Sequence, residues 1–152
     1  DIKNLVEAEK SWDEITNSIR ANNPNARIKG MVIQPIAKGK EIIIGIKRDK
    51  TFGPVIVFGM GGIFTEALKD VSSRIAPVNK SEAKKMIEEI KGYPILKGLR
   101  GEKPIDFAKL ENLIVSVSKL SLEHPEIQEI DLNPVMATET EAKIVDARVI
   151  TN

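Results

Sequence analysis

The sequence has no cysteine, one histidine, one tryptophan and one tyrosine among its 152 residues. Without cysteine the chain has no disulfide, no zinc–thiolate site and no thiol nucleophile. A single histidine excludes any metal site that needs several histidines. The longest apolar runs are only a few residues long, so we expect neither a membrane span nor a secretory signal. We therefore expect a cytoplasmic protein.

The chain also lacks an excess of charge of either sign. Its 23 Lys and Arg residues balance 22 Asp and Glu residues, which gives a net charge of +1, and the two signs are interspersed. Proteins that bind nucleic acid or anionic membranes concentrate positive charge, so neither partner is expected here. Hydrophobic residues make up 41% and charged residues 30%, as in a folded domain of ordinary size. Because the chain starts with Asp1 and not Met, we expect a piece of a longer protein.

The pattern of apolar residues predicts an α+β domain with a mostly antiparallel sheet and flanking helices. Helices are expected to follow the N-cap residues Asn4, Ser81 and Asp106. One more short helix is expected near Phe64, and the glycine-rich residues 93–101 are expected to be irregular. Strands are predicted where β-branched residues dominate, at residues 28–35, 41–48, 54–58, 72–77, 127–136 and 143–150.

The last predicted hairpin carries the clearest group of polar residues. Residues two apart on a strand point to the same face, so Asp131 and Asn133 project together, as do Asp146 and Arg148 on the partner strand. Oxygen ligands without nitrogen or sulfur suit Mg²⁺, which completes its shell with water and phosphate oxygens. A solvated strand face with Asp146 paired to a lysine is the commoner explanation of the same residues, because surface carboxylates are frequent. Spacing alone therefore leaves both interpretations open.

A second feature is the glycine-rich stretch Gly59–Gly62, which follows a predicted strand. Glycines there let the backbone approach a ligand closely, and the start of a following helix would favour an anion. Glu66 adds an acidic candidate. The spacing matches neither a Walker loop nor the dinucleotide fingerprint, so a sharp turn without a ligand is an equally good interpretation.

A third feature is the apolar segment Ile33, Gln34, Pro35 and Ile36, followed by Glu41. A strand that ends at a proline leaves backbone N–H and C=O groups free, and such groups can bind the edge of an adenine. The carboxylate of Glu41 could accept hydrogen bonds from ribose hydroxyls. An edge strand, a turn and a surface glutamate remain the simpler interpretation from these residues alone.

These features occur together and in order with other specific strings. The strings are Gly39–Gly45, Phe52–Gly62, Tyr93–Gly101, Glu129–Val135 and Val145–Arg148. On this ordered set the chain resembles the ATP-grasp β subunit, or β-like domain, of ADP-forming acyl-CoA synthetases of the acetate–CoA ligase type. It is more distantly similar to the β subunit of succinyl-CoA synthetase. The resemblance covers essentially the whole chain.

The resemblance implies a role for each candidate residue. Asp131, Asn133 and Asp146 correspond to the Mg²⁺ cluster that bridges the nucleotide phosphates, and Arg148 would lie beside those phosphates. The hinge that holds the adenine would consist of Ile33, Gln34, Pro35 and Ile36, and the carboxylate that binds the ribose would be Glu41. The loop that faces the transferred phosphate would contain Gly61, Gly62 and Glu66. The implied cofactors are Mg²⁺ and ATP or ADP.

The resemblance also implies a reaction and a partner. The family converts acyl-CoA, ADP and phosphate reversibly into acid, CoA and ATP through a phosphohistidine. Residues 1–152 correspond to about the C-terminal two-thirds of the ATP-grasp domain, and His124 does not match the carrier motif. We therefore expect the chain to be inactive alone and to need a CoA-binding α subunit or domain, most simply as a hetero-oligomer. Two alternatives stay open: a regulatory module of a fused protein acetyltransferase, and a succinyl-CoA-type β subunit.

Overall fold

The computed structural model describes residues 2–62, 69–99 and 101–152, and the chain divides into two units, Asp1–Ile36 and Ala37–Asn152. The first unit contains α1 (Leu5–Asn22), which begins where its cap was predicted. The side chain of Asn4 accepts a hydrogen bond from the backbone N–H of Glu7 at 2.9 Å, and the Glu7 carboxylate accepts one from the N–H of Lys3 at 2.8 Å. These bonds satisfy amides that a helix start leaves without partners.

The strand predicted over residues 28–35 is wrong. This segment has no regular secondary structure, and no strand pairs with it among the described residues of the chain. β-branched content alone does not make a strand, because strand amides and carbonyls need the backbone of a neighbour. Its apolar side chains stay largely exposed, with Val32 at 79% and Ile33 at 66%.

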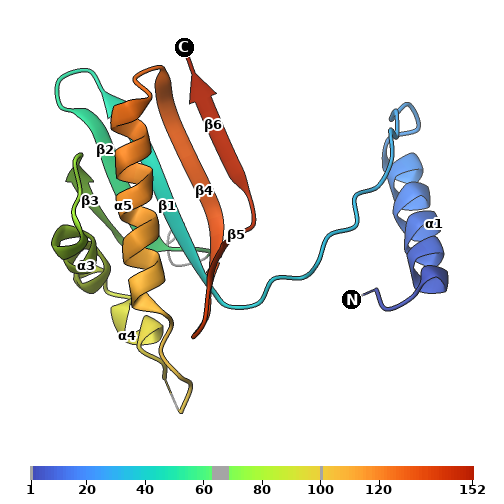
Figure 1. Cartoon of the computed structure of the whole chain (residues 1–152). Helices are drawn as coiled ribbons and strands as arrows, with labels where there is room; N and C mark the ends of the chain where they lie inside the picture. The colour runs from blue at the N-terminus through green and yellow to red at the C-terminus, as the bar shows by residue number, and fades with distance from the viewer. Residues whose placement is uncertain (1, 63–68, 100) are drawn as a thin grey trace. The chain divides into compact units, whose positions relative to one another are not determined.

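The described residues of the second unit form a six-stranded sheet, and its antiparallel pairing is as predicted (Figure 1). The order of the strands is β3-β2-β1-β4-β5, and β6 also pairs with β4. Their bounds are β1 (Lys40–Asp49), β2 (Gly53–Met60), β3 (Val71–Ile75), β4 (Ile127–Ala137), β5 (Ala142–Ile144) and β6 (Ala147–Thr151). The long strands β1 and β4 therefore lie side by side at the centre.

Among the described residues of this unit, three helices lie on one face of the sheet, namely α3 (Lys80–Glu89), α4 (Tyr93–Leu96) and α5 (Phe107–Glu123) (Figure 1). Strand residues alternate between this covered face and the opposite face. In β1 the side chains of Ile42, Ile44 and Ile46 are buried against the helices. Each such side chain stabilises the fold by about 1.5–3 kcal/mol. None of the helices among the described residues has the length and apolar character needed to cross a membrane.

The helix boundaries differ from the predictions in two places. Asn79, not Ser81, is the N-cap of α3, and its side chain accepts a hydrogen bond from the N–H of Glu82 at 3.0 Å. Both residue types cap helices well, so local sequence does not distinguish them. The supposedly irregular residues 93–101 begin with the single turn α4, where Pro94 lies in the first turn and its missing N–H costs nothing. The predicted cap Asp106 of α5 is confirmed. The helix expected near Phe64 falls outside the described residues.

The strand predicted over residues 143–150 is interrupted at Val145 and Asp146, which leaves β5 and β6 as separate strands. Pro134 of β4 lies opposite this break and has no N–H to donate to a ladder. Two backbone bonds still cross the break, from Asn133 N–H to the Asp146 carbonyl and from Val145 N–H to the Pro134 carbonyl. The register is the same on both sides of the break, so Asn133 lies opposite Asp146.

Ser118 makes a buried connection that can be tested. Its hydroxyl accepts a hydrogen bond from the N–H of Val78 at 2.8 Å, and its side chain is 1% exposed. Ser118→Ala should lower the free energy of unfolding by about 1–3 kcal/mol, because a buried N–H loses its partner. Urea unfolding measures this change. Ser116→Ala, at an exposed position of the same helix, is the control and should change stability by less than about 0.5 kcal/mol. Equal effects of both substitutions would contradict the assignment.

Candidate functional site

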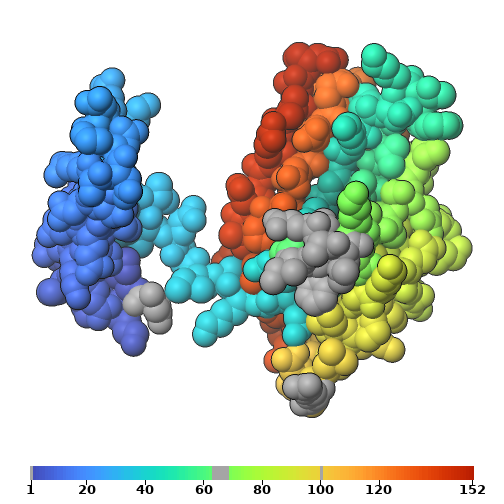
Figure 2. All heavy atoms as spheres, turned by 180° about the vertical axis from the view of Figure 1, so that it is seen from behind, coloured from blue at the N-terminus to red at the C-terminus, as the bar shows by residue number. Residues whose placement is uncertain are grey.

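The polar residues of the last hairpin gather on the sheet face that the described helices leave uncovered. Ile130 and Leu132 point into the core, so Asp131 between them points outward. Arg148 of β6 is the direct register partner of Asp131 and shares its face. Figure 2 shows the second unit from behind, where β4 and β6 are seen without a covering helix. The register therefore places Asp131 and Arg148 on one face of the sheet, a pairing across the two strands that the spacing of residues within each strand did not predict.

Asn133 and Asp146 also come together, although Asp146 lies in the break between two strands. The Asn133 N–H donates to the Asp146 carbonyl at 3.2 Å, and both residues are exposed. The carboxylate of Asp146 accepts a hydrogen bond from the N–H of Ala147 at 2.9 Å. This bond orients the carboxylate at the point where β6 begins.

The donors in this group are two carboxylates and one amide, which is a chemistry that suits Mg²⁺. No ion pair holds Asp131 or Asp146 within residues 37–152 as far as the structure describes them. The described part of the chain has no cluster of three or more His, Cys, Asp or Glu residues arranged for a metal. A metal at Asp131, Asn133 and Asp146 would therefore need further oxygen atoms from water or phosphate.

A second group of predicted residues meets where β1 begins and β2 ends. The N–H of Gly61 donates to the carbonyl of Glu41 at 2.7 Å. A Cβ at position 61 would lie only 2.8 Å from the Cβ of Glu41, so this close approach requires glycine. Gly62 has φ +62°, and a Cβ there would lie 3.0 Å from Oε2 of Glu41. The structure therefore places Glu41 directly beside both glycines, with its backbone and Cβ against Gly61 and its carboxylate against Gly62.

These three residues line a cavity of about 520 Å³. Its other lining residues are Gly39, Lys40, Met60 and Ile95. Ile95 belongs to α4, so the cavity has one wall from the sheet and one from that helix. A cavity of this size can hold part of a small ligand.

Two other predicted parts of the site lie outside the described part of the second unit. Ile33, Gln34, Pro35 and Ile36 belong to the first unit, where they line a separate cavity of about 390 Å³ together with Ile2 and Ile15. Their backbone groups pair with no strand in the part of the chain that is described. Glu66 falls outside the described residues.

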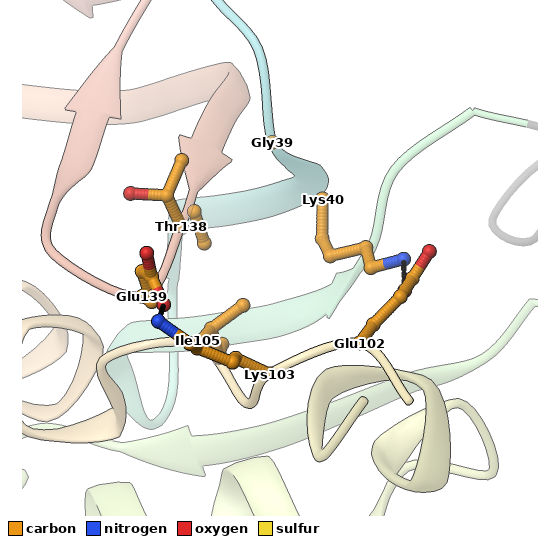
Figure 3. Close-up of a pocket in the computed structure, with 8 residues that line it drawn as sticks. Gly39, Lys40, Glu102, Lys103, Ile105, Thr138 and Glu139 are labelled. Atoms are coloured by element: carbon orange, nitrogen blue, oxygen red, sulfur yellow. Dashed lines mark hydrogen bonds and ion pairs between the residues drawn. The ribbon is translucent and has the colours of Figure 1, made fainter. Parts of the chain in front are cut away.

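A neighbouring cavity of about 480 Å³ was not anticipated from the sequence (Figure 3). Gly39 and Lys40 line it together with Glu102, Lys103, Ile105 and residues 137–139. Two ion pairs cross its rim: Lys40 Nζ lies 2.6 Å from Glu102, and Lys103 Nζ lies 2.8 Å from Glu139. The hydrogen bond to Glu139 raises the pKa of Lys103 above its ordinary value. The strings Gly39–Gly45 and Tyr93–Gly101 are the sequence signals near this place.

Comparison with known proteins identifies the family. The model of the ATP-grasp domain matches residues 1–151. The β subunit of acetate–CoA ligase (ADP-forming) I from Pyrococcus furiosus is 50% identical over 150 residues, which are 98% of this chain and 65% of that subunit. The acetate–CoA ligase (ADP-forming) I of Archaeoglobus fulgidus is 51% identical over 143 residues, which are 93% of this chain and 21% of that protein.

A solved structure agrees with these relatives. The acetyl-CoA synthetase 1 of Ca. Korarchaeum cryptofilum, in complex with coenzyme A and Mg-AMPPCP, is 37% identical and superposes with a TM-score of 0.84. The match covers 100% of this chain and 66% of that one. The chain thus spans about two-thirds of the β subunit it matches and a smaller share of the longer protein. Sequence, family model and fold agree, and the chain belongs to the ATP-grasp family.

Proposed function

We propose that this chain is the nucleotide-binding part of an ADP-forming acyl-CoA synthetase. The reaction is acyl-CoA, ADP and phosphate giving acid, CoA and ATP, in either direction, with a phosphohistidine carrying the phosphoryl group. The observation that carries the proposal is the placement of Asp131, Asn133, Asp146 and Arg148 on one uncovered face of the sheet. The 50% identity to a subunit of an ADP-forming acetate–CoA ligase supports the proposal that this face binds the nucleotide phosphates.

Asp131, Asn133 and Asp146 are the residues that would hold Mg²⁺. The ion would supply charge that neutralises the phosphate oxygens during transfer. Asn133 and Asp146 lie opposite each other across the ladder, and the bond from the Ala147 N–H orients the Asp146 carboxylate. Arg148 faces Asp131, and its guanidinium would lie beside the phosphates as a second positive group.

Glu41 and the two glycines would hold the ribose and the phosphate end of the nucleotide. The carboxylate of Glu41 would accept hydrogen bonds from the ribose hydroxyls. The N–H of Gly61 already donates to the Glu41 carbonyl, so Gly61 shapes the loop of Gly61, Gly62 and Glu66 that is proposed to face the transferred phosphate. The backbone groups of Ile33, Gln34, Pro35 and Ile36 are proposed to hold the adenine.

The proposed partner is the CoA-binding α subunit or domain of the same synthetase, in a hetero-oligomer in the cytoplasm. One relative is named as a separate β subunit, and another matches over only 21% of a much longer chain. These two arrangements support a domain that works with a CoA-binding part, fused or separate. A regulatory module of a fused acetyltransferase would bind nucleotide without making ATP, and a succinyl-CoA-type subunit would prefer succinyl-CoA. An assay of ATP formation with acetyl-CoA and succinyl-CoA separates all three.

The metal assignment predicts a loss of turnover in Asp146→Asn. The substitution removes one negative ligand while keeping the size of the side chain, so kcat of the full-length subunit assembled with its CoA-binding partner should fall by about a hundredfold or more. ATP formation from acetyl-CoA, ADP and phosphate measures it. Glu111→Gln is the matched control, because α5 covers the other face of the sheet. Unchanged kcat in Asp146→Asn would exclude this carboxylate as a metal ligand.

The ribose assignment predicts a different kinetic change for Glu41→Gln. Hydrogen bonds to a charged group are worth about 1.5–3 kcal/mol, and the neutral amide keeps only one acceptor, so the KM for ADP should rise about tenfold. The ribose is held equally in the ground state and the transition state, so kcat should change little. Steady-state kinetics with varied ADP, again beside Glu111→Gln, test this. A fall of kcat at constant KM would contradict the ribose role.

A further inference from the structure

The ion pair between Lys40 and Glu102 connects two walls of the cavity that contains Glu41. Lys40 is the first residue of β1 and lines that cavity as well as the neighbouring one. Its Nζ lies 2.6 Å from Oε2 of Glu102, a residue on the loop that follows α4 (Figure 3). The two residues are 62 positions apart in the chain. Their contact therefore joins two segments that are distant in the sequence and lie close together only in the folded chain.

Backbone contacts fix the position of Glu102 relative to α4. Gly98 has φ +86°, and a Cβ there would lie 2.1 Å from the carbonyl oxygen of Glu102, so the loop packs tightly on itself at this glycine. The N–H of Glu102 donates to the Leu99 carbonyl at 3.1 Å, and the N–H of Ile105 donates to the Leu96 carbonyl at 3.1 Å. These contacts couple the position of Glu102 to the position of the C-terminal end of α4.

The N-terminal end of α4 is held by a different group. Asp70, which is 5% exposed, accepts hydrogen bonds from the N–H of Lys91 at 2.7 Å and of Gly92 at 2.6 Å. These buried bonds precede the helix, and the loop with Glu102 follows it. Ile95, between these two anchors, lines the cavity. The position of this wall therefore depends on contacts at both ends of α4.

The start of β1 is packed closely on its other sides. Gly39 has φ +145°, and a Cβ there would lie 2.6 Å from the carbonyl oxygen of Ala137. The carbonyl of Glu41 accepts the N–H of Gly61 on the opposite side. The backbone on both sides of Lys40 is thus packed against β4 and against Gly61, which follows β2. The Lys40 side chain extends from this fixed backbone to Glu102 on the loop after α4.

We propose that Lys40 is a positioning residue of the nucleotide site, which acts by holding the α4 wall of the cavity against the strand that carries Glu41. This inference rests on the proposed function of Glu41. The Lys40 side chain is 31% exposed and that of Glu102 57%, so the pair contributes little to the stability of the fold. Its effect falls on the width of the cavity and hence on nucleotide affinity.

The chain contains a matched control in the pair formed by Lys103 and Glu139. This pair joins the same loop to the turn between β4 and β5 at 2.8 Å. Lys103 is 77% exposed and Glu139 48%, so this pair is also a surface pair, and neither residue lines the cavity with Glu41. If attachment of the loop were all that mattered, loss of either pair would lower the affinity for ADP. If the α4 wall of the cavity must be positioned, only the loss of the pair between Lys40 and Glu102 would lower it.

The test compares Lys40→Gln, Glu102→Gln and Lys103→Gln in the full-length subunit assembled with its CoA-binding partner. Lys40→Gln and Glu102→Gln should each raise the KM for ADP about fivefold, the upper end for loss of an exposed pair, with kcat within about twofold. Lys103→Gln should leave both constants unchanged. Lys40→Arg should keep the wild-type KM, and the exchange Lys40→Glu with Glu102→Lys should recover most of the affinity that either reversal alone loses.

Several outcomes overturn the inference. Equal KM values for ADP in Lys40→Gln and Lys103→Gln would contradict it. A rise of KM in Lys40→Gln that Glu102→Gln does not share would also contradict it, because Lys40 would then contact the nucleotide directly. Failure of the exchanged pair to recover affinity also contradicts it. Calorimetric measurement of ADP binding to the same proteins separates the two proposals. A wild type that binds ADP but makes no ATP contradicts the proposed function. The affinities of the variants for ADP still decide the role of Lys40 in that case.

Discussion

The one-residue bulge of β4 opposite β1 is the constraint on which the candidate site depends. Ile42 pairs with Val135 and Ile44 pairs with Leu132, so the two β4 residues between these pairs, Asn133 and Pro134, face the single residue Ile43. A strand without the extra residue would turn Val135 or Leu132 out of the core, because a shift of one position exchanges the two faces. The bulge keeps both apolar pairs buried and still presents Asn133 on the uncovered face, opposite Asp146.

The same two strands carry both proposed ends of the nucleotide site. Glu41 and Ile43 point to the same face of β1, and they are separated by roughly 7 Å along a strand. Ile43 is the residue that the bulge faces, and neighbouring strands are about 5 Å apart. The proposed ribose carboxylate and the proposed metal ligand Asn133 are thus separated by one two-residue step along β1 and one strand spacing. Rigid central strands, not loops, set this spacing.

The sequence patterns predicted the strands and caps that depend on local preferences or on alternation along the chain. They missed the features that depend on a segment distant in the sequence. The strands at residues 41–48 and 127–136 and the cap at Asp106 follow from β-branched content and local capping chemistry. Residues 28–35 also contain several β-branched residues but lack a pairing strand among the described residues, and the break near Asp146 lies opposite a proline on the neighbouring strand. Spacing alone left every site role open until the resemblance assigned it, and the assignments of roles stay predictions.

The near-neutral charge of the chain agrees with a site that binds phosphate through a few placed groups. A net charge of +1 provides little long-range attraction for a nucleotide, so the affinity must come from contacts at close range. Arg148 opposite Asp131 reduces the repulsion between neighbouring carboxylates on this face. Because such contacts weaken steeply with distance, small changes in the cavity walls are expected to change affinity. An exposed ion pair such as Lys40 with Glu102 can therefore influence binding while contributing almost nothing to the stability of the fold.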